Sequence, residues 1–126
     1  ISTHDMSTLR GWWEEDYLQT QRYYNTMLAH YGTAPTVATP ELCEEIVRNH
    51  LKSNSILCIL SLQDWLSIDG KWRNPNVQEE RINVPSNPRN YWRYRMHLTL
   101  EQLMKAKGLN DKIRELIKYT GRAPKK

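Results

Sequence analysis

Hydrophobic positions recur at helical spacing in two stretches of the first half of the chain. The first stretch predicts a helix that Ser7 or Thr8 caps and that runs to about Tyr31. The second begins at Thr39-Pro40, because threonine caps helices and proline suits the first helical turn, and it ends near Ser53. We therefore expect two amphipathic helices before residue 54.

A continuous apolar run follows at Ile56 to Leu62. It is short and contains β-branched residues, so it predicts a strand buried on both faces, as in parallel sheets. Helices on either side of a buried strand indicate an α/β arrangement. A single strand forms no sheet, so its backbone groups need neighbours from another copy of the chain or from sequence outside it.

The second half of the chain begins with an irregular stretch, residues 67–90, which carries three prolines. We expect a helix from Tyr91 to about Ala106. A further helix from Asp111 to Tyr119 takes Asn110 as its cap. The chain itself is thus expected to be mostly α-helical, with one or two short strands.

The composition is poor in apolar residues for a self-contained domain. The chain has 126 residues, the usual size of one domain, and only 39% of them are apolar, with five Trp and seven Tyr but no Phe. Tyrosine and tryptophan favour half-wet surfaces, because each carries a polar group. We expect residues 1–126 to form one segment whose aromatic side chains line a cleft or an interface.

Charge and cysteine usage indicate a cytoplasmic protein. The net charge of +4 owes much to residues 122–126, which predict a flexible basic tail. No apolar run approaches the roughly 18 residues of a membrane span, so no membrane association is expected. Cys43 and Cys58 match no metal or disulfide spacing, and Cys58 is expected to be a buried, reduced thiol.

Polar groups concentrate ahead of the first predicted helix, at Thr3-His4-Asp5. On spacing alone, Asp5 or Ser7 is simply a helix cap, and His4 an exposed imidazole. A His-Asp pair at the carboxyl end of a barrel strand would instead point a carboxylate and a hydrogen-bonding ring into one pocket. Residue types alone leave both interpretations open.

The segment Thr3-His4-Asp5, with Thr8, Gly11 and Trp12 after it, resembles the last signature region of the 4-α-glucanotransferases of glycoside hydrolase family 77. Three further blocks resemble that family in the same order: Gln63-Asp64, Glu79-Glu80-Arg81-Ile82-Asn83-Val84-Pro85 and Trp92-Arg93-Tyr94-Arg95-Met96. The four blocks cover about three quarters of the chain.

This resemblance implies an α/β fold, the C-terminal part of a (β/α)8 TIM barrel of the α-amylase clan, in a bacterial enzyme. It implies transfer of α-1,4-glucan segments between maltodextrins with retention, through a covalent glucosyl-enzyme intermediate. The nucleophile and the acid/base would lie upstream of Ile1, so the chain alone would be inactive. No cofactor or metal is implied. The expected partners are the maltodextrin and the upstream barrel, and an orphan strand edge favours self-association.

The resemblance also implies roles for individual residues. Asp5 matches the carboxylate that stabilises the transition state, and His4 matches the neighbour that hydrogen-bonds the same sugar. Asn83 matches a loop residue near the cleft. Trp72 offers a flat face for a glucose ring, with plain packing as the equal alternative. Glu79 is expected to pair with a basic group.

Two other classes of function remain as alternatives. Basic and aromatic residues interleave in Arg89 to Arg95, as they do where proteins stack bases and neutralise phosphates. Against an RNA-binding module, acidic residues flank the cluster and no RNA-binding signature is present. A helical interaction domain without chemistry is the third class. His30, His50 and His97 have no metal-ligand spacing and are expected to be ordinary histidines.

Overall fold

Helix α3 (Pro40–Leu51) contributes five buried residues to the core of the structure, a computed structural model that describes residues 2–124. Thr39 caps it by accepting a hydrogen bond from the Leu42 amide at 3.3 Å, and proline occupies its first turn, so the predicted helix is confirmed. The fully buried side chains around it come from several elements: Trp13, Cys43, Ile46, Val47, Ile68 and Leu109.

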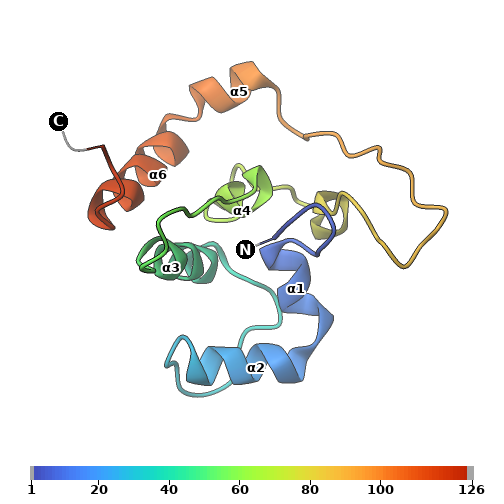
Figure 1. Cartoon of the computed structure of the whole chain (residues 1–126), viewed down its shortest axis with the longest axis horizontal. Coiled ribbons are helices and arrows are strands. Elements are labelled where there is room, and N and C mark those ends of the chain that lie inside the picture. The colour runs from blue at the N-terminus through green and yellow to red at the C-terminus, as the bar shows by residue number, and fades with distance from the viewer. Residues whose placement is uncertain (1, 125–126) are drawn as a thin grey trace.

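The other helices that the structure describes (Figure 1) are α1 (Leu9–Glu15), α2 (Tyr17–Thr26), α4 (Leu62–Leu66), the 3-10 helix η1 (Val77–Glu80), α5 (Leu100–Lys105) and α6 (Lys107–Tyr119). Helix α1 contacts α2 and η1, and α3 contacts α4 and α6. Residues 81–99 form a long irregular segment that swings outward after η1 and returns to α5. Within residues 2–124, no helix combines the length and apolar character needed to cross a membrane.

The first predicted helix is two helices, broken at Asp16. The Asp16 carboxylate accepts hydrogen bonds from the amides of Leu18 and Gln19, so it caps α2 and ends α1 at the same point. Helix α2 ends at Thr26, before the expected end near Tyr31. It cannot continue through Ala29, whose left-handed φ of 55° is not helical. The helical spacing of apolar residues continues through Asp16 and therefore does not reveal that this residue separates two helices.

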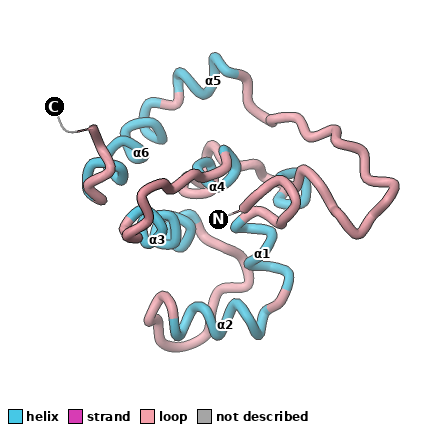
Figure 2. Tube along the Cα trace, viewed as in Figure 1, coloured by secondary structure: helices cyan, strands magenta, loops and turns pink. Residues whose placement is uncertain are grey.

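The predicted strand at residues 56–62 is wrong for the structure described here. Residues 2–124 contain no strand (Figure 2), and Leu62 already belongs to α4. The side chains of Ile56 and Ile59 are 96% and 81% exposed. Strand geometry requires hydrogen-bonding neighbours, and the described chain places none beside this segment.

The helix predicted from Tyr91 to Ala106 is also wrong in its first half. Helix α5 begins only at Leu100, because Thr99 and Gln102 form a capping box in which each side chain bonds the other residue's amide. Asn110 does not cap α6. Its side-chain amide instead donates to the Leu103 carbonyl at 2.9 Å and so satisfies the end of α5.

Cysteine burial and the C-terminal region differ partly from expectation. Burial raises the pKa of the Cys43 thiol to about 11, whereas Cys58, expected to be buried, is only half-buried. Arg122, placed in a flexible tail by the sequence, donates to the carbonyls of Leu51 and Ser55 and holds the end of α6 against α3. Lys125 and Lys126 lie outside the described residues.

Replacing Ile46 by alanine should destabilise the chain by about 2 to 5 kcal/mol, because the side chain is 1% exposed and its loss leaves a cavity at the centre of the core. Urea unfolding of both proteins measures the difference. Asn49→Ala, on the exposed face of the same helix, is the control and should change stability by less than about 0.5 kcal/mol. Equal effects of the two substitutions would contradict the central position of Ile46.

Candidate functional site

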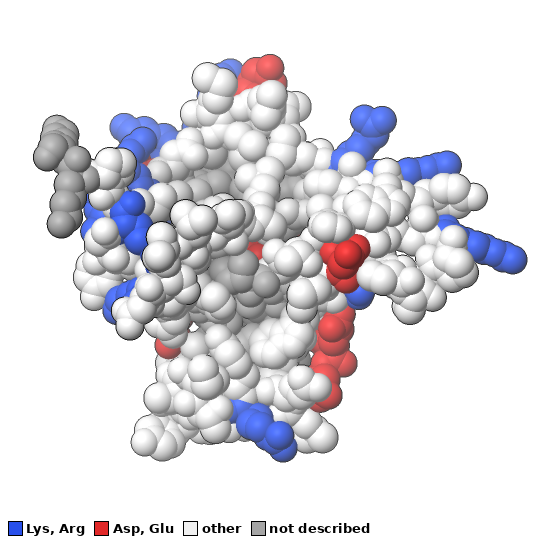
Figure 3. Space-filling model, viewed as in Figure 1, with Lys and Arg blue, Asp and Glu red and all other residues white. Residues whose placement is uncertain are grey.

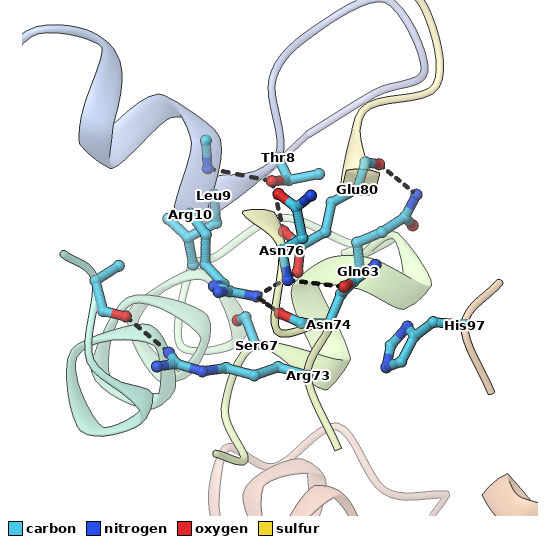
Figure 4. A network of polar contacts seen from close by, with 12 residues as sticks. Thr8, Leu9, Arg10, Gln63, Ser67, Arg73, Asn74, Asn76, Glu80 and His97 are labelled. Atoms are coloured by element: carbon cyan, nitrogen blue, oxygen red, sulfur yellow. Dashed lines mark hydrogen bonds and ion pairs between the residues drawn. The ribbon is translucent and has the colours of Figure 1, made fainter. Parts of the chain in front are cut away.

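A buried ion pair joins the first turn of α1 to the end of η1 (Figure 4). The Arg10 guanidinium donates to the Glu80 carboxylate at 2.6 Å, with the two side chains only 5% and 3% exposed. The other Glu80 oxygen accepts from the Thr8 hydroxyl at 2.9 Å. Arg10 also donates to the Asn74 carbonyl at 2.7 Å. Residues about 70 positions apart are thereby held together.

The environment of Glu80 opposes its negative charge. Burial raises the pKa of its carboxyl group above the ordinary 4.5, although Arg10 and Thr8 act in the opposite direction. The sequence indicated Glu79 as the residue with a basic partner, and this is wrong. Glu79 is exposed and accepts a hydrogen bond from the Asn76 amide, whereas Glu80 holds the arginine.

The Gln63-Asp64 block forms a second connection between the same segments. Asp64 is fully buried and accepts hydrogen bonds from the backbone amides of Leu9 and Ser2 and from the Ser2 hydroxyl, at 2.8 to 3.0 Å. Gln63 donates to the Glu80 carbonyl at 3.1 Å. Helix α4 therefore holds Ser2 and Leu9 through Asp64, and it holds the end of η1 through Gln63.

These connections bring together three of the four residues expected at a site. The Asn83 side-chain amide donates to Asp5 Oδ1 at 2.8 Å, and the Asn83 backbone amide donates to the His4 carbonyl at 3.1 Å. His4 Nε2 lies 3.3 Å from Asp5 Oδ2, and both side chains are about half exposed. Residues 78 positions apart in sequence thus share one exposed polar cluster.

The cluster borders a cleft of about 440 Å³ whose lining includes Asp5, Ser7, Trp12, Glu15 and Arg81. Arg81 donates to the Ser7 hydroxyl at 2.9 Å and lies 3.3 Å from Glu15. The cleft thus presents the Asp5 carboxylate beside an aromatic face and an ion pair. Such an arrangement can stabilise positive charge and accept hydrogen bonds from hydroxyl groups.

Sequence reasoning missed two residues of this cluster. The Asn90 side-chain amide donates to Asn83 Oδ1 at 2.8 Å. The Trp92 ring lies 5.3 Å from the His4 ring, between centroids, and remains 63% exposed. Asn90 ends the stretch expected to be irregular, and Trp92 lies near the start of the expected helix, so neither position was expected at a site.

Trp72 is not brought to the cluster by any contact among the described residues. Its ring packs against the core and under the Lys71 ammonium, 5.0 Å away, and its carbonyl lies 3.0 Å from His97 Nε2. His30 lies 2.7 Å from a Glu45 carboxylate oxygen. No group of three metal-ligating side chains occurs within residues 2–124.

Comparison with known proteins supplies the family. The model of glycoside hydrolase family 77, described as 4-alpha-glucanotransferase, matches residues 1–100. This range contains the whole His4, Asp5 and Asn83 cluster. The chain belongs to glycoside hydrolase family 77.

Curated relatives agree with this assignment. The chain is 41% identical to the 4-alpha-glucanotransferase DPE2 of Oryza sativa subsp. japonica over 122 residues, which is 97% of the chain and 13% of that protein. It is 31% identical to the 4-alpha-glucanotransferase of Chlamydia muridarum over 92% of the chain and 22% of that protein. No solved structure matches.

Two consequences follow for the family 77 chain. It spans less than a quarter of the length of either relative. The expected bacterial origin gains no support, since these relatives come from a plant and from a bacterium. The RNA-binding alternative is not favoured either. Basic side chains do project from the face that carries residues 81–99 (Figure 3), but acidic side chains gather next to them.

Replacing Arg10 by methionine should destabilise the family 77 chain by about 3 to 5 kcal/mol at pH 7, because Glu80 then stays buried without its cation. The raised pKa of Glu80 sets the sign of the pH dependence. Protonated Glu80 contributes stability below its ordinary pKa of 4.5, and this contribution is lost as pH rises through its raised pKa in the folded chain. The loss is larger without Arg10, because the buried carboxylate then has no cation beside it. Urea unfolding from pH 8 to pH 5 should therefore show the deficit shrinking.

The double variant Arg10→Met, Glu80→Gln is the control for this experiment. It removes both charges and should recover much of the lost stability, with a deficit that hardly varies with pH. A deficit that grows as pH falls in Arg10→Met would contradict this account of the pair.

Proposed function

We propose that the chain is part of a 4-α-glucanotransferase that transfers α-1,4-glucan segments between maltodextrins with retention. The single observation that carries the proposal is the convergence of His4, Asp5 and Asn83 in a chain that belongs to family 77. Two separate motifs supply these residues, and their meeting beside a cleft is what a shared sugar site requires.

The proposed role of Asp5 is to stabilise positive charge on the sugar ring at the transition state. Asn83 fixes one carboxylate oxygen, so the other oxygen, near His4, is oriented without cost at the moment of reaction. His4 is proposed to hydrogen-bond the same sugar. Retention needs a nucleophile and a general acid about 5 to 5.5 Å apart, and the resemblance assigns both to other parts of the enzyme.

The proposed function also implies a fold, a substrate class and a cellular location for the whole protein. The chain would form the C-terminal portion of a (β/α)8 barrel, where active sites lie at the carboxyl ends of the strands. The exposed apolar side chains of Ile56, Leu57 and Ile59 support this, since further parts of a larger protein would cover them. The substrate class is α-1,4-glucan, and the proposed location is the cytoplasm. Self-association of the isolated chain stays a prediction.

The chain expressed alone should have no transferase activity, because the proposed nucleophile and general acid lie elsewhere in the enzyme. The measurement is incubation with maltotriose, followed by analysis for glucose and longer maltodextrins. The full-length protein carrying this segment is the positive control. Turnover by the chain alone would contradict the proposed distribution of catalytic groups.

In the full-length protein, Asp5→Asn should lower kcat roughly 100- to 1000-fold, the size of effect seen when one preorganised charge-stabilising group is lost. Thermal unfolding should change little, since Asp5 is about half exposed. Asp111→Asn removes the same charge from the surface of α6 and serves as the matched control. A near-normal rate in Asp5→Asn would refute the proposed stabilising role.

A further inference from the structure

Asn90 lies directly behind the Asn83 side chain, on the side away from Asp5. Its side-chain amide donates to Asn83 Oδ1 at 2.8 Å, and the Asn83 amide nitrogen in turn donates to Asp5 Oδ1 at 2.8 Å. The three side chains form a chain of two hydrogen bonds that ends on the proposed catalytic carboxylate.

The chemistry of these groups fixes the direction of both bonds. An ionised carboxylate only accepts, so Asn83 must present its NH2 group to Asp5. The Asn83 carbonyl oxygen then faces Asn90, which must donate. Without that donor, only the Asp5 carboxylate orients the Asn83 amide, and nothing holds its carbonyl oxygen on the far side.

The loop around Asn90 is itself held in place. The Asn90 backbone amide donates to the Asn87 carbonyl at 3.0 Å, and Asn87 Oδ1 accepts from the Arg89 amide at 3.0 Å. Two residues further on, the Trp92 ring lies against His4. The segment therefore reaches both members of the His4-Asp5 pair, one through Asn83 and one through a ring contact.

We propose that Asn90 is a positioning residue for Asp5, which acts by orienting the Asn83 amide so that its NH2 group holds one oxygen of the catalytic carboxylate. Asn90 does not touch the substrate in this scheme. The inference rests on the proposed function, because it takes Asp5 to act on the sugar ring.

The test is Asn90→Asp in the full-length protein, assayed with maltotriose. The substitution keeps the side chain's shape but replaces the donor by an acceptor. The Asn83 NH2 group is then drawn to the new carboxylate, and its carbonyl oxygen faces Asp5, where two acceptors repel. We expect kcat to fall about 10- to 100-fold, as for loss of a hydrogen bond to a charged group, while KM changes less than about threefold.

Asn87→Asp is the matched control. It adds the same charge to the same loop and preserves the one contact of the Asn87 side chain, since a carboxylate accepts from the Arg89 amide equally well. Its kcat should stay within about twofold of the unchanged protein. A similar fall in both variants would mean that charge alone causes the effect and would overturn the proposal.

A double-mutant cycle separates positioning from general loosening of the loop. If Asn90 acts through Asn83, Asn90→Ala should lower kcat in the unchanged protein but should have almost no further effect in an Asn83→Ala background. Additive effects would overturn the proposal. So would an Asn90→Asp variant with normal kcat when Asp5→Asn is impaired.

Failure of the proposed function has a different signature, since the unchanged full-length protein would then lack transferase activity altogether. The hydrogen-bond chain is in that case decided by NMR of protein labelled with ¹⁵N in asparagine side chains. Asp5→Asn should shift the Asn83 side-chain amide signal in the unchanged protein and not in Asn90→Asp. Identical shifts in the two backgrounds would overturn the inference.

Discussion

The structure depends on the buried pair of Arg10 and Glu80. Helix α1 begins one residue before Arg10, and the 3-10 helix η1 ends at Glu80. The His4-Asp5 pair precedes the first of these elements, and Asn83 follows the second. Joining the two elements through a short, water-excluded contact therefore places both halves of the candidate site side by side. The site is exposed, but the contact that assembles it is buried.

Irregular backbone forms most of this site, so side chains must supply the order that helices and strands provide elsewhere. Asp64 accepts three hydrogen bonds from Ser2 and Leu9, and Gln63 holds the Glu80 carbonyl. An unpaired buried carboxylate is costly, which makes Asp64 a strong restraint on any path the first residues take. The Gln63-Asp64 block is thus a structural element of the site rather than part of its chemistry.

The sequence predicts a helix correctly where short-range features, such as a capping residue and a regular apolar face, determine it. Helix α3 follows from a Thr39-Pro40 start and a regular apolar face, and it appears as expected. Asp16 and Thr99 cap helices inside patterns that look continuous, because a side chain competing for backbone amides leaves no mark on hydrophobic spacing. Residues 56–62 have the composition of a strand, but a strand exists only where a neighbour pairs with it.

The residues of the candidate site also differ in how far the sequence predicts them. Resemblance to a family predicted that His4, Asp5 and Asn83 belong together, and the geometry does bring them together. The sequence left Trp72 evenly divided between sugar contact and packing; its ring packs partly against the core, and the sugar contact stays a prediction. Asn90 was not predicted, since an asparagine that orients another asparagine has no periodicity, charge or spacing of its own. Glu79 and Glu80 are adjacent, and only burial distinguishes the paired residue from the solvated one.

Exposure of Asp5 bears on how much of the enzyme the proposed chemistry needs. A fixed carboxylate stabilises a developing positive charge far more strongly in a water-excluded site than in contact with solvent. Asp5 is 50% exposed in this chain, so its orientation is preorganised by Asn83 while its surroundings are not. Geometry is thus supplied by this segment, and exclusion of water requires the substrate together with the parts of the enzyme that enclose it. Orientation by Asn83 and exclusion of water therefore both concern the Asp5 carboxylate, and the proposed stabilisation of positive charge needs both.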